Sequence, residues 1–409
     1  MPYLRWLEIS RRHAARPAIF DGDRIVTFAG LAAAVSQAPP AGAPVIARSG
    51  GIEFFVEILR AWRDGQPVIP VERDAPEPVL HCPPPAGTCL VKYTPGASGI
   101  PRGIFLNAAQ VAADGDRNAG AMGLTPATPN LAVISLAHSY GFSNVVLPLI
   151  LHGVPVHLAP VPFPRMIEEI FKQHPALVVP AVPSMWRAWH RAGILKGAPI
   201  SLALSAGAPL ALALENDVFA ASGVKIRNFY GASECGGISF DTSDTPRESA
   251  DEVGTPLPGV HVSIGRDGRL LVESSGVATG YDATRNDDLL GNGAYLTRDL
   301  GFLDAAGKIH LTGTLGGAIN VAGRKVSPAK VEAAILATGL TRRVKVFGIP
   351  SNDPERFEEI AVLVEPLPGI SLGDLKAAAA AKLQSWELPR HWKTDPALWL
   401  LPAAALRGI

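Results

Sequence analysis

Cysteine is scarce in this chain of 409 residues, which contains only Cys82, Cys89 and Cys235. An odd number of cysteines without metal-type spacing argues against a disulfide framework and indicates no cysteine metal site. This small number of cysteines is consistent with a reducing compartment, so we expect a cytoplasmic protein. Residues 1–6 also lack the apolar run and the small-residue cleavage site of a secretory signal, so none is expected.

An excess of charge of one sign and a long apolar run are missing as well. Lysine plus arginine equals aspartate plus glutamate at 37 each, so the composition does not favour nucleic acid or an anionic membrane as a partner. The apolar stretch 131–151 is interrupted by polar residues and a proline. We therefore interpret it as core helix and strand, and expect no membrane span.

Length and periodicity point to a two-domain α/β protein. A chain of 409 residues is longer than a single hydrophobic core usually supports, so two domains of unequal size are expected. Strand-like and helix-like segments alternate, which predicts parallel sheet with helical cover. The expected strands include 24–28, 67–71, 88–93, 131–136, 154–158 and 177–180, and the expected helices include 54–62, 107–121, 164–173 and 185–191.

Residues 93–103 form the stretch Tyr-Thr-Pro-Gly-Ala-Ser-Gly-Ile-Pro-Arg-Gly, directly after an expected strand. Its glycines let backbone N–H groups approach an anion, and with hydroxyls and a cation they can form a nest for phosphate oxygens. The spacing is not that of a Walker loop. A stretch rich in glycine and proline is also typical of a plain surface turn, so only motifs elsewhere in the chain favour the phosphate interpretation.

This stretch resembles the phosphate-binding signature of the adenylate-forming superfamily, Tyr-Thr-Ser-Gly-Thr-Thr-Gly-x-Pro-Lys-Gly. That superfamily contains acyl-CoA synthetases, aryl-acid ligases, adenylation domains and luciferases. Pro95 and Ala97 replace hydroxyl residues, and Arg102 replaces the lysine. The resemblance implies phosphate binding by Thr94, Gly96, Ser98, Gly99, Arg102 and Gly103.

His138 follows the expected strand 131–136. In the superfamily, an aromatic residue or histidine at this position gates the carboxylate pocket. The alternative is a core histidine bonded to a backbone carbonyl. Because open α/β sheets bind ligands at the carboxyl ends of their strands, we favour the pocket.

Residues 205–210 and 229–234 resemble two further motifs, Ser-Gly-Gly-Ala-Pro-Leu and Tyr-Gly-x-Thr-Glu. The resemblance implies that Tyr230 stacks on a purine, that Ser233 donates to the α-phosphate, and that Glu234 ligates Mg²⁺. Outside this context, a glutamate after a turn is usually solvated. The other implied nucleotide contacts are Ala206, Gly207, Ala208, Gly231 and Ala232, and the implied acyl-pocket lining is His138, Ala206, Gly207, Gly231, Gly236 and Gly237.

The C-terminal motifs resemble the superfamily with departures. Asp299 stands where an aspartate binds the ribose, although Arg298 replaces the preceding glycine. Gly323 and Lys325 match the face that meets the pantetheine of the thiol acceptor. The departures are Thr314 for an arginine that grips ATP, Gly316 for the hinge acidic residue, and Gly408, next to Arg407, for the lysine that assists adenylation.

The resemblance implies an α/β fold in two parts. Residues 1–313 are expected to form a large AMP-binding domain of layered α/β sheets with a small β-barrel-like part. Residues 314–409 are expected to form a small mobile α+β lid. Only a short proline-rich bridge separates residues 70 and 93, so the large domain is expected to be shortened near its N-terminus.

The implied reaction joins a small carboxylic acid, aromatic or short, to a thiol. Mg²⁺-ATP would adenylate the acid, and CoA or the phosphopantetheine of an acyl carrier protein would then displace AMP. The catalytic candidates are His138, Ser233, Glu234 and Asp299. Two alternatives stay open because of the departures: a member that only binds its ligands, or one that keeps only the thioester half-reaction.

Overall fold

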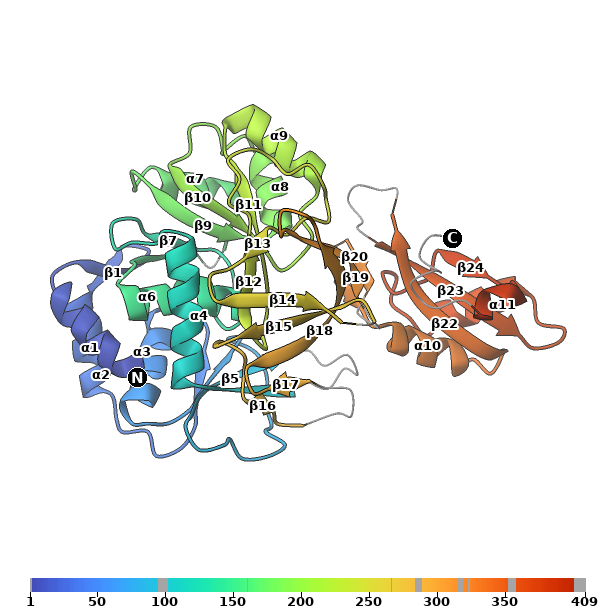
Figure 1. The fold of residues 1–409 in the computed structure, drawn as a ribbon, viewed down its shortest axis with the longest axis horizontal. Helices are drawn as coiled ribbons and strands as arrows, with labels where there is room; N and C mark the ends of the chain where they lie inside the picture. The colour runs from blue at the N-terminus through green and yellow to red at the C-terminus, as the bar shows by residue number, and fades with distance from the viewer. Residues whose placement is uncertain are drawn as a thin grey trace. The chain divides into compact units, whose positions relative to one another are not determined.

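The computed structural model describes residues 2–94, 102–159, 161–265, 267–283, 289–314, 319–322, 324–351 and 358–400. The chain divides into two compact units (Figure 1). Of the described residues, the larger unit holds 2–94, 102–297 and 301–311, and the smaller unit holds 298–300 and 312–400. The predicted α/β class and two-part architecture are confirmed. No described helix combines the length and apolar character needed to cross a bilayer.

A nine-stranded sheet forms the centre of the larger unit. Its strands β11, β10, β9, β7, β8 and β1 run parallel, so their carboxyl ends meet at one edge. Strand β9 is buried along its whole length, as expected for a parallel strand covered on both faces. In sheet order the strands are β13 (Thr255–Pro256), β12 (Gly236–Phe240), β11 (Ile226–Ala232), β10 (Ile200–Ser205), β9 (Leu177–Ala181), β7 (Asn130–Ala132), β8 (Val156–Leu158), β1 (Pro17–Asp21) and β2 (Arg24–Thr27).

Two further sheets have five strands each, and all of their residues belong to the larger unit except 298–300 of β18 and 312–314 of β19. The first contains β3 (Val45–Arg48), β4 (Val68–Val71), β5 (Thr88–Thr94), β6 (Arg102–Asn107) and β16 (Gly280–Tyr281). The second contains β14 (Val260–Ile264), β15 (Arg269–Ser274), β17 (Leu290–Gly291), β18 (Ala294–Leu303) and β19 (Ile309–Thr314). Strands β14 and β15 form an antiparallel hairpin around residues 267–268, with Val260 opposite Ser274.

Helix α4 (Ala108–Ala121) connects the sheets, because it contacts β5 and β6 of one sheet and β12 of another (Figure 1). Its first residue is preceded by a capping box, in which Asn107 accepts from the backbone N–H groups of Ala109 and Gln110 while the Gln110 side chain accepts from the N–H of Asn107. The remaining helices of the unit are α1 (Pro2–Arg12), α2 (Phe28–Gln37), α3 (Ile52–Arg63), α5 (Ser139–Gly141), the π-helical η1 (Phe142–Val146), α6 (Leu147–His152), α7 (Pro164–Phe171), α8 (Pro183–Arg191) and α9 (Leu212–Ser222).

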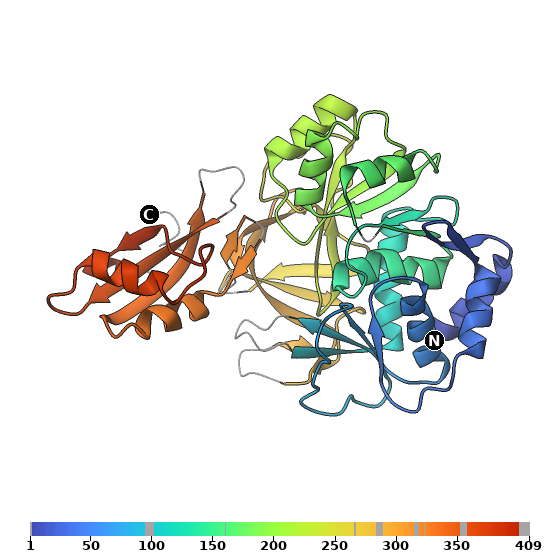
Figure 2. The same cartoon turned by 180° about the vertical axis from the view of Figure 1, so that it is seen from behind.

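The smaller unit, drawn in orange and red, is a separate α+β module (Figure 2). Ser327 caps α10 and Pro328 occupies its first turn, a combination typical of a helix start. Its own apolar core contains Val331, Ile335 and Val362. Its elements are β20 (Ile319–Val321), β21 (Arg324–Val326), α10 (Pro328–Leu336), β22 (Thr341–Pro350), β23 (Glu358–Pro366), α11 (Leu372–Ala380), β24 (His391–Lys393) and the 3₁₀-helix η2 (Pro396–Leu400).

One predicted strand is shorter than expected. The apolar run 131–136 predicts a strand of six residues, but β7 is only Asn130–Ala132. Val133, Ile134 and Leu136 are nevertheless buried. These residues pack in the core after the chain has left the sheet. A short apolar run in the sequence does not distinguish such a buried segment from a strand.

Candidate active site

The turn between β11 and β12 places Glu234 in the interior of the larger unit. Only 9% of Glu234 is exposed, and its Oε1 accepts a hydrogen bond of 2.8 Å from the hydroxyl of Tyr281. The carbonyl of Glu234 accepts from the N–H of Ala278 at 2.8 Å. Burial raises the pKa of the Glu234 carboxyl, against the opposing effects of the Tyr281 hydrogen bond and the Arg102 charge. The side chain is therefore not the solvated glutamate that its position after a turn would suggest.

Arg102 lies close to this carboxylate, on the first residue of β6. Its guanidinium sits over the ring of Tyr281, 3.8 Å from the ring centroid. The N–H of Gly103 donates to Oδ1 of Asp282 at 2.8 Å, and a Cβ at Gly103 would lie 3.0 Å from the other carboxylate oxygen. Arg102, Tyr281 and Glu234 thus form a continuous series of contacts.

The predicted phosphate loop is anchored at the same place. Thr94 at the end of β5 pairs with Arg102 at the start of β6 in the antiparallel ladder. The two described residues that flank the predicted loop therefore lie side by side, and Arg102 contacts Tyr281. Three of the predicted phosphate ligands, Gly96, Ser98 and Gly99, lie outside the described residues.

His138 and Ser139 follow β7, and Ser139 reaches the same turn. The hydroxyls of Ser139 and Ser233 form a hydrogen bond of 2.6 Å. The His138 side chain is 68% exposed, and its Nε2 lies 3.3 Å from Oε1 of Glu72. Exposure of this degree excludes the alternative of a core histidine. Glu72 also accepts hydrogen bonds from the hydroxyls of Ser49 and Ser135.

The other predicted residues of the larger unit lie at the carboxyl edge of the nine-stranded sheet, where such sheets bind ligands. After β10, Ala206 is buried, Gly207 has φ of +79° and Ala208 is half-buried. Tyr230 and Ala232 on β11 are half-buried, and Gly231 is exposed. The predicted adenine and acyl contacts therefore share an edge with His138 and Glu234.

Gly236 and Gly237 have a packing reason for being glycine. A Cβ at Gly236 would lie 2.0 Å from Oδ1 of Asp114, and one at Gly237 would lie 2.3 Å from Oδ1 of Asn118. Helix α4 therefore fills the space on the Cβ side of both residues. Their assignment to the acyl pocket stays a prediction.

The remaining predicted residues belong to the smaller unit. There the hydroxyl of Thr314 donates to Oδ1 of Asp299 at 3.0 Å. The backbone of Lys325 pairs with Asn320 in the β20–β21 hairpin. Gly316, Gly323, Arg407 and Gly408 lie outside the described residues.

Several residues at the site had no predicted role. Tyr281 is the second residue of the pair Gly280-Tyr281 and Asp282 follows it, but nothing in the local sequence indicates that they contact Glu234 and Gly103. Ser139 neighbours the predicted His138, so proximity in sequence is a signal for it. Glu72 and Asp114 had no signal of this kind.

The residues present fit a magnesium ion that is shared with a nucleotide. Within the described part of the chain, no group of three or more histidine, cysteine, aspartate or glutamate side chains is arranged to hold a metal. Mg²⁺ is commonly bound by one or two carboxylates together with substrate phosphates and water. Glu234, a buried carboxylate beside the anchored ends of the predicted phosphate loop, suits that mode, whereas the equally buried Asp282 already accepts from the N–H of Gly103.

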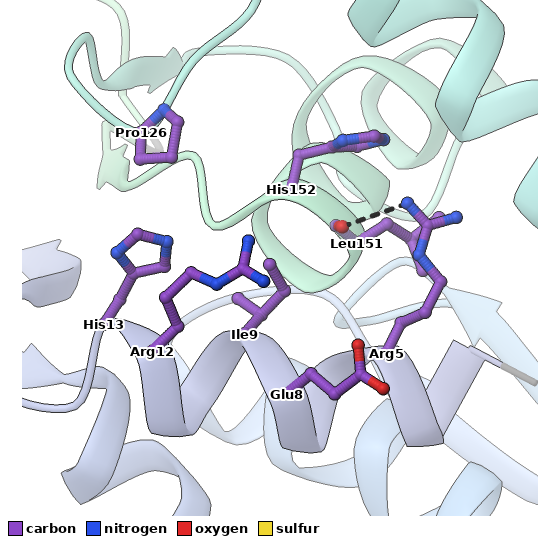
Figure 3. Close-up of a pocket in the computed structure, with 8 residues that line it drawn as sticks. All are labelled: Arg5, Glu8, Ile9, Arg12, His13, Pro126, Leu151 and His152. Carbon is purple, nitrogen blue, oxygen red and sulfur yellow. Dashed lines mark hydrogen bonds between the residues drawn. The ribbon is translucent and has the colours of Figure 1, made fainter.

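A hollow of about 450 Å³ lies elsewhere on the larger unit, between α1 and the end of α6 (Figure 3). Its basic side chains are partly neutralised, since Arg5 and His152 both lie within 3 Å of Asp116. None of the predicted site residues lines it. The lining residues are Arg5, Glu8, Ile9, Arg12, His13, Pro126, Leu151 and His152.

Comparison with known proteins identifies the family and the fold. A family model described as AMP-binding enzyme matches residues 49–282, that is, 234 of the 409 residues. The sulfoacetate–CoA ligase of Cupriavidus necator is 24% identical over 369 residues, which cover 85% of this chain and 70% of that protein. The anthranilate–CoA ligase of Pseudomonas aeruginosa is 29% identical over 282 residues, which cover 63% of this chain and 52% of that protein. The chain thus spans about half of the second relative's length.

Solved structures share the fold. The o-succinylbenzoate CoA synthetase of Bacillus subtilis has a TM-score of 0.73 at 18% identity, over 96% of this chain and 94% of that one. A malonyl-CoA ligase with methylmalonyl-CoA and AMP bound has a TM-score of 0.71 at 23% identity, over 93% of this chain and 96% of that one. Because the family model also matches more than half of the sequence, the chain belongs to the AMP-binding enzymes, the adenylate-forming superfamily that its motifs resemble.

Proposed function

We propose that this protein is an ATP-dependent acid–thiol ligase. It would activate a small carboxylic acid as an acyl-adenylate and pass the acyl group to CoA. The observation that carries the proposal is the series of contacts from Arg102 through Tyr281 to Glu234, joined to Ser233 and Ser139 at the carboxyl edge of the sheet. These contacts bring a cation, hydroxyl donors and the buried Glu234 carboxylate together beside the two ends of a predicted phosphate loop.

Each side chain has a role in the proposed first step. The substrate carboxylate attacks the α-phosphorus of ATP, and the bond to pyrophosphate breaks. Bound Mg²⁺ would neutralise phosphate charge, and Glu234 is the residue that would hold it. Ser233 would donate to the α-phosphate, and Arg102 would contribute positive charge near the phosphates. Asp299 would accept hydrogen bonds from the ribose.

The second step would transfer the acyl group to a thiol. Sulfur attacks the acyl carbon and AMP leaves. We propose that residues 314–409 act as the mobile lid between the steps, with Gly323 and Lys325 near the pantetheine. An acyl carrier protein is the alternative acceptor to CoA. A flat aromatic or short acid is the proposed substrate, and anthranilate and sulfoacetate, named in two of the relatives, are suitable first compounds.

A second candidate function is a member impaired in adenylation. The specific observation in its favour is the Thr314–Asp299 hydrogen bond, because Thr314 stands where the superfamily has an ATP-gripping arginine and its hydroxyl occupies one oxygen of the proposed ribose ligand. Such a protein would bind an adenylate or catalyse only thioester formation.

Pyrophosphate exchange with aryl and short-chain acids, run beside thioester formation from a synthetic acyl-adenylate, tests both candidates. Exchange with at least one acid supports the ligase. Thioester formation without exchange supports the half-reaction, and no reaction in either assay leaves ligand binding alone. A Glu234→Ala variant is the control, since it should abolish the Mg²⁺-dependent exchange.

The Gly408→Lys variant tests the C-terminal departure. Loss of one preorganised charge costs on the order of a hundred- to a thousandfold in rate at such a centre. Restoring a lysine should therefore accelerate exchange if residue 408 occupies the position that the sequence predicts. Unchanged exchange would contradict the assignment of that position.

A further inference from the structure

A buried network of polar and charged side chains lies beneath the three segments that the proposed site uses. It consists of Lys92, Asp114, Arg117, Asn118 and Ser143, each of which is at most 8% exposed. We propose that Asp114 and Arg117 of α4 are positioning residues, which fix the Ser233–Glu234 turn relative to the strand that enters the phosphate loop. The inference deepens the proposed ligase function and rests on it for its catalytic consequence.

Asp114 holds the turn on its carboxyl side. Its Oδ1 accepts hydrogen bonds from the N–H of Gly237 at 3.0 Å and from Nδ2 of Asn118 at 3.2 Å. Its Oδ2 accepts from the hydroxyl of Ser143 at 2.5 Å. A carboxylate that is 2% exposed and has three donors is fixed in place, because moving it would leave buried polar groups without partners.

Arg117 holds the residue directly after Glu234. Its guanidinium donates to the carbonyl of Cys235 at 3.1 Å and lies 3.6 Å from Oδ1 of Asp114. One turn of α4 therefore contacts both Cys235 and Gly237, on either side of Gly236. Absence of a Cβ at Gly236 lets the carboxylate approach this backbone closely.

The pairing of β11 with β12 is irregular next to the Ser233–Glu234 turn. The β11–β12 ladder has a register shift between Tyr230 and Gly231, immediately before the turn. Such an irregularity weakens pairing and re-aims the following residues. Contacts from α4 then determine where Glu234 lies.

The network also reaches the phosphate loop and the His138 segment. Lys92, on β5 two residues before Thr94, donates to the hydroxyl of Ser143 at 3.4 Å. Ser143 belongs to η1, which follows Ser139. Burial lowers the pKa of Lys92, and the negative charge of Asp114 acts in the opposite direction. Helix α4 contacts β5, η1 and β12, so one helix joins all three segments (Figure 1).

The Asp114→Asn variant tests this inference, with Asp116→Asn as the matched control. Both substitutions change an aspartate of α4 to its amide, but Asp116 pairs with Arg5 and His152, away from the turn. In Asp114→Asn we expect faster hydrogen exchange in peptides that cover residues 233–240. We also expect the Mg²⁺ concentration for half-maximal turnover to rise by about 10- to 100-fold, as for other residues that orient metal ligands. Asp116→Asn should change neither quantity.

The Ser143→Ala variant replaces Asp114→Asn if the latter does not fold. It removes only the hydroxyl between Lys92 and Asp114. Hydrogen exchange and the Mg²⁺ requirement should therefore change in the same direction as in Asp114→Asn, but less. Equal exchange in residues 233–240 for wild type and variants overturns the inference. Faster exchange with an unchanged Mg²⁺ requirement also overturns it, because the turn would then move without consequence. The exchange measurement needs no substrate, so a wild type without ligase activity would refute the proposed function while the positioning contacts were still tested.

Discussion

At the scale of single residues, Glu234 is subject to two opposing effects. Burial favours its neutral form, whereas the Tyr281 hydroxyl and the Arg102 charge favour the carboxylate. A divalent cation would add strongly to the second effect. A bound metal ion would therefore favour the ionised form of Glu234, which burial alone disfavours. This balance gives the first prediction.

Glu234→Gln should reduce Mg²⁺-dependent turnover on the order of a hundredfold, as expected for the loss of one preorganised group. Stability should not fall, because the amide is not penalised by burial as a carboxylate is. In wild type, Mg²⁺ binding should weaken as the pH falls through the raised pKa of Glu234, since the protonated group is a poor ligand. Calorimetric Mg²⁺-ATP titrations between pH 5 and 8 measure this, and Glu273→Gln, an exposed glutamate on β15, is the control.

Gly236 provides a second prediction at this scale. Gly236→Ala and Gly259→Ala both place a Cβ on a residue with positive φ, +73° and +76° respectively. That conformation costs about 1–2 kcal/mol for alanine. Only at Gly236 would the Cβ also overlap Asp114, while at Gly259 no heavy atom lies within 4 Å. Gly236→Ala should therefore lose about 1–3 kcal/mol more in the free energy of unfolding, measured by urea titration. Equal losses would mean that Asp114 can move aside.

At the scale of elements, the parallel strands explain why separate motifs gather. β7, β10 and β11 each end at one edge, so the residues after them meet although they are far apart in the chain. Strand β8 of the same sheet carries a histidine that contacts a second histidine, His174. His157 on β8 is 3% exposed, and its Nδ1 lies 2.8 Å from Nε2 of His174.

The His157 pair predicts a dependence of stability on pH. Burial, and next the neighbouring His174, lower the pKa of His157 to about 4. Between the unfolded value near 6.5 and this lower value, the unfolded state binds a proton that the folded state does not. The free energy of unfolding should therefore fall as the pH drops from about 6.5 to 4, with about 2–3 kcal/mol due to this group.

His157→Asn should remove that component, so its unfolding free energy should change less between pH 7 and 4.5 than that of wild type. Chemical denaturation at several pH values measures the difference. His261→Asn, at an exposed position of β14, should behave like wild type. The same pH dependence in His157→Asn and wild type would show that other groups cause the acid sensitivity.

At the scale of the whole molecule, the two units have separate cores. The clusters around Val331 and Phe347 share no residue with those of the larger unit. A fragment of residues 1–314, which keeps β19 intact, should therefore fold by itself. Near-UV circular dichroism during heating should show one cooperative transition. A fragment without near-UV signal would indicate that the larger core depends on the smaller unit.

Local sequence was sufficient for much of the fold. Asn107 with Gln110 marks the start of α4, Ser327-Pro328 marks the start of α10, and a turn at residues 267–268 joins β14 and β15. Each of these features depends on residues that are close in sequence, so the local sequence is sufficient to predict it. The order of the motifs likewise identified the adenylate-forming family. The run 131–136 did not give the strand end before His138 correctly, because β7 already ends at Ala132.

Only the tertiary structure decided which side chains support those motifs. Tyr281 meets Glu234 from 47 residues away, and Asp114 meets Gly237 from 123 residues away. Nothing in either segment's composition indicates its partner, because a buried hydrogen bond depends on how two elements pack and not on their own periodicity. The sequence by itself determined the family and nominated site residues, whose ligand contacts stay predictions. Only the packing of α4 against the sheets decided that Asp114 and Arg117 meet the backbone on either side of Gly236.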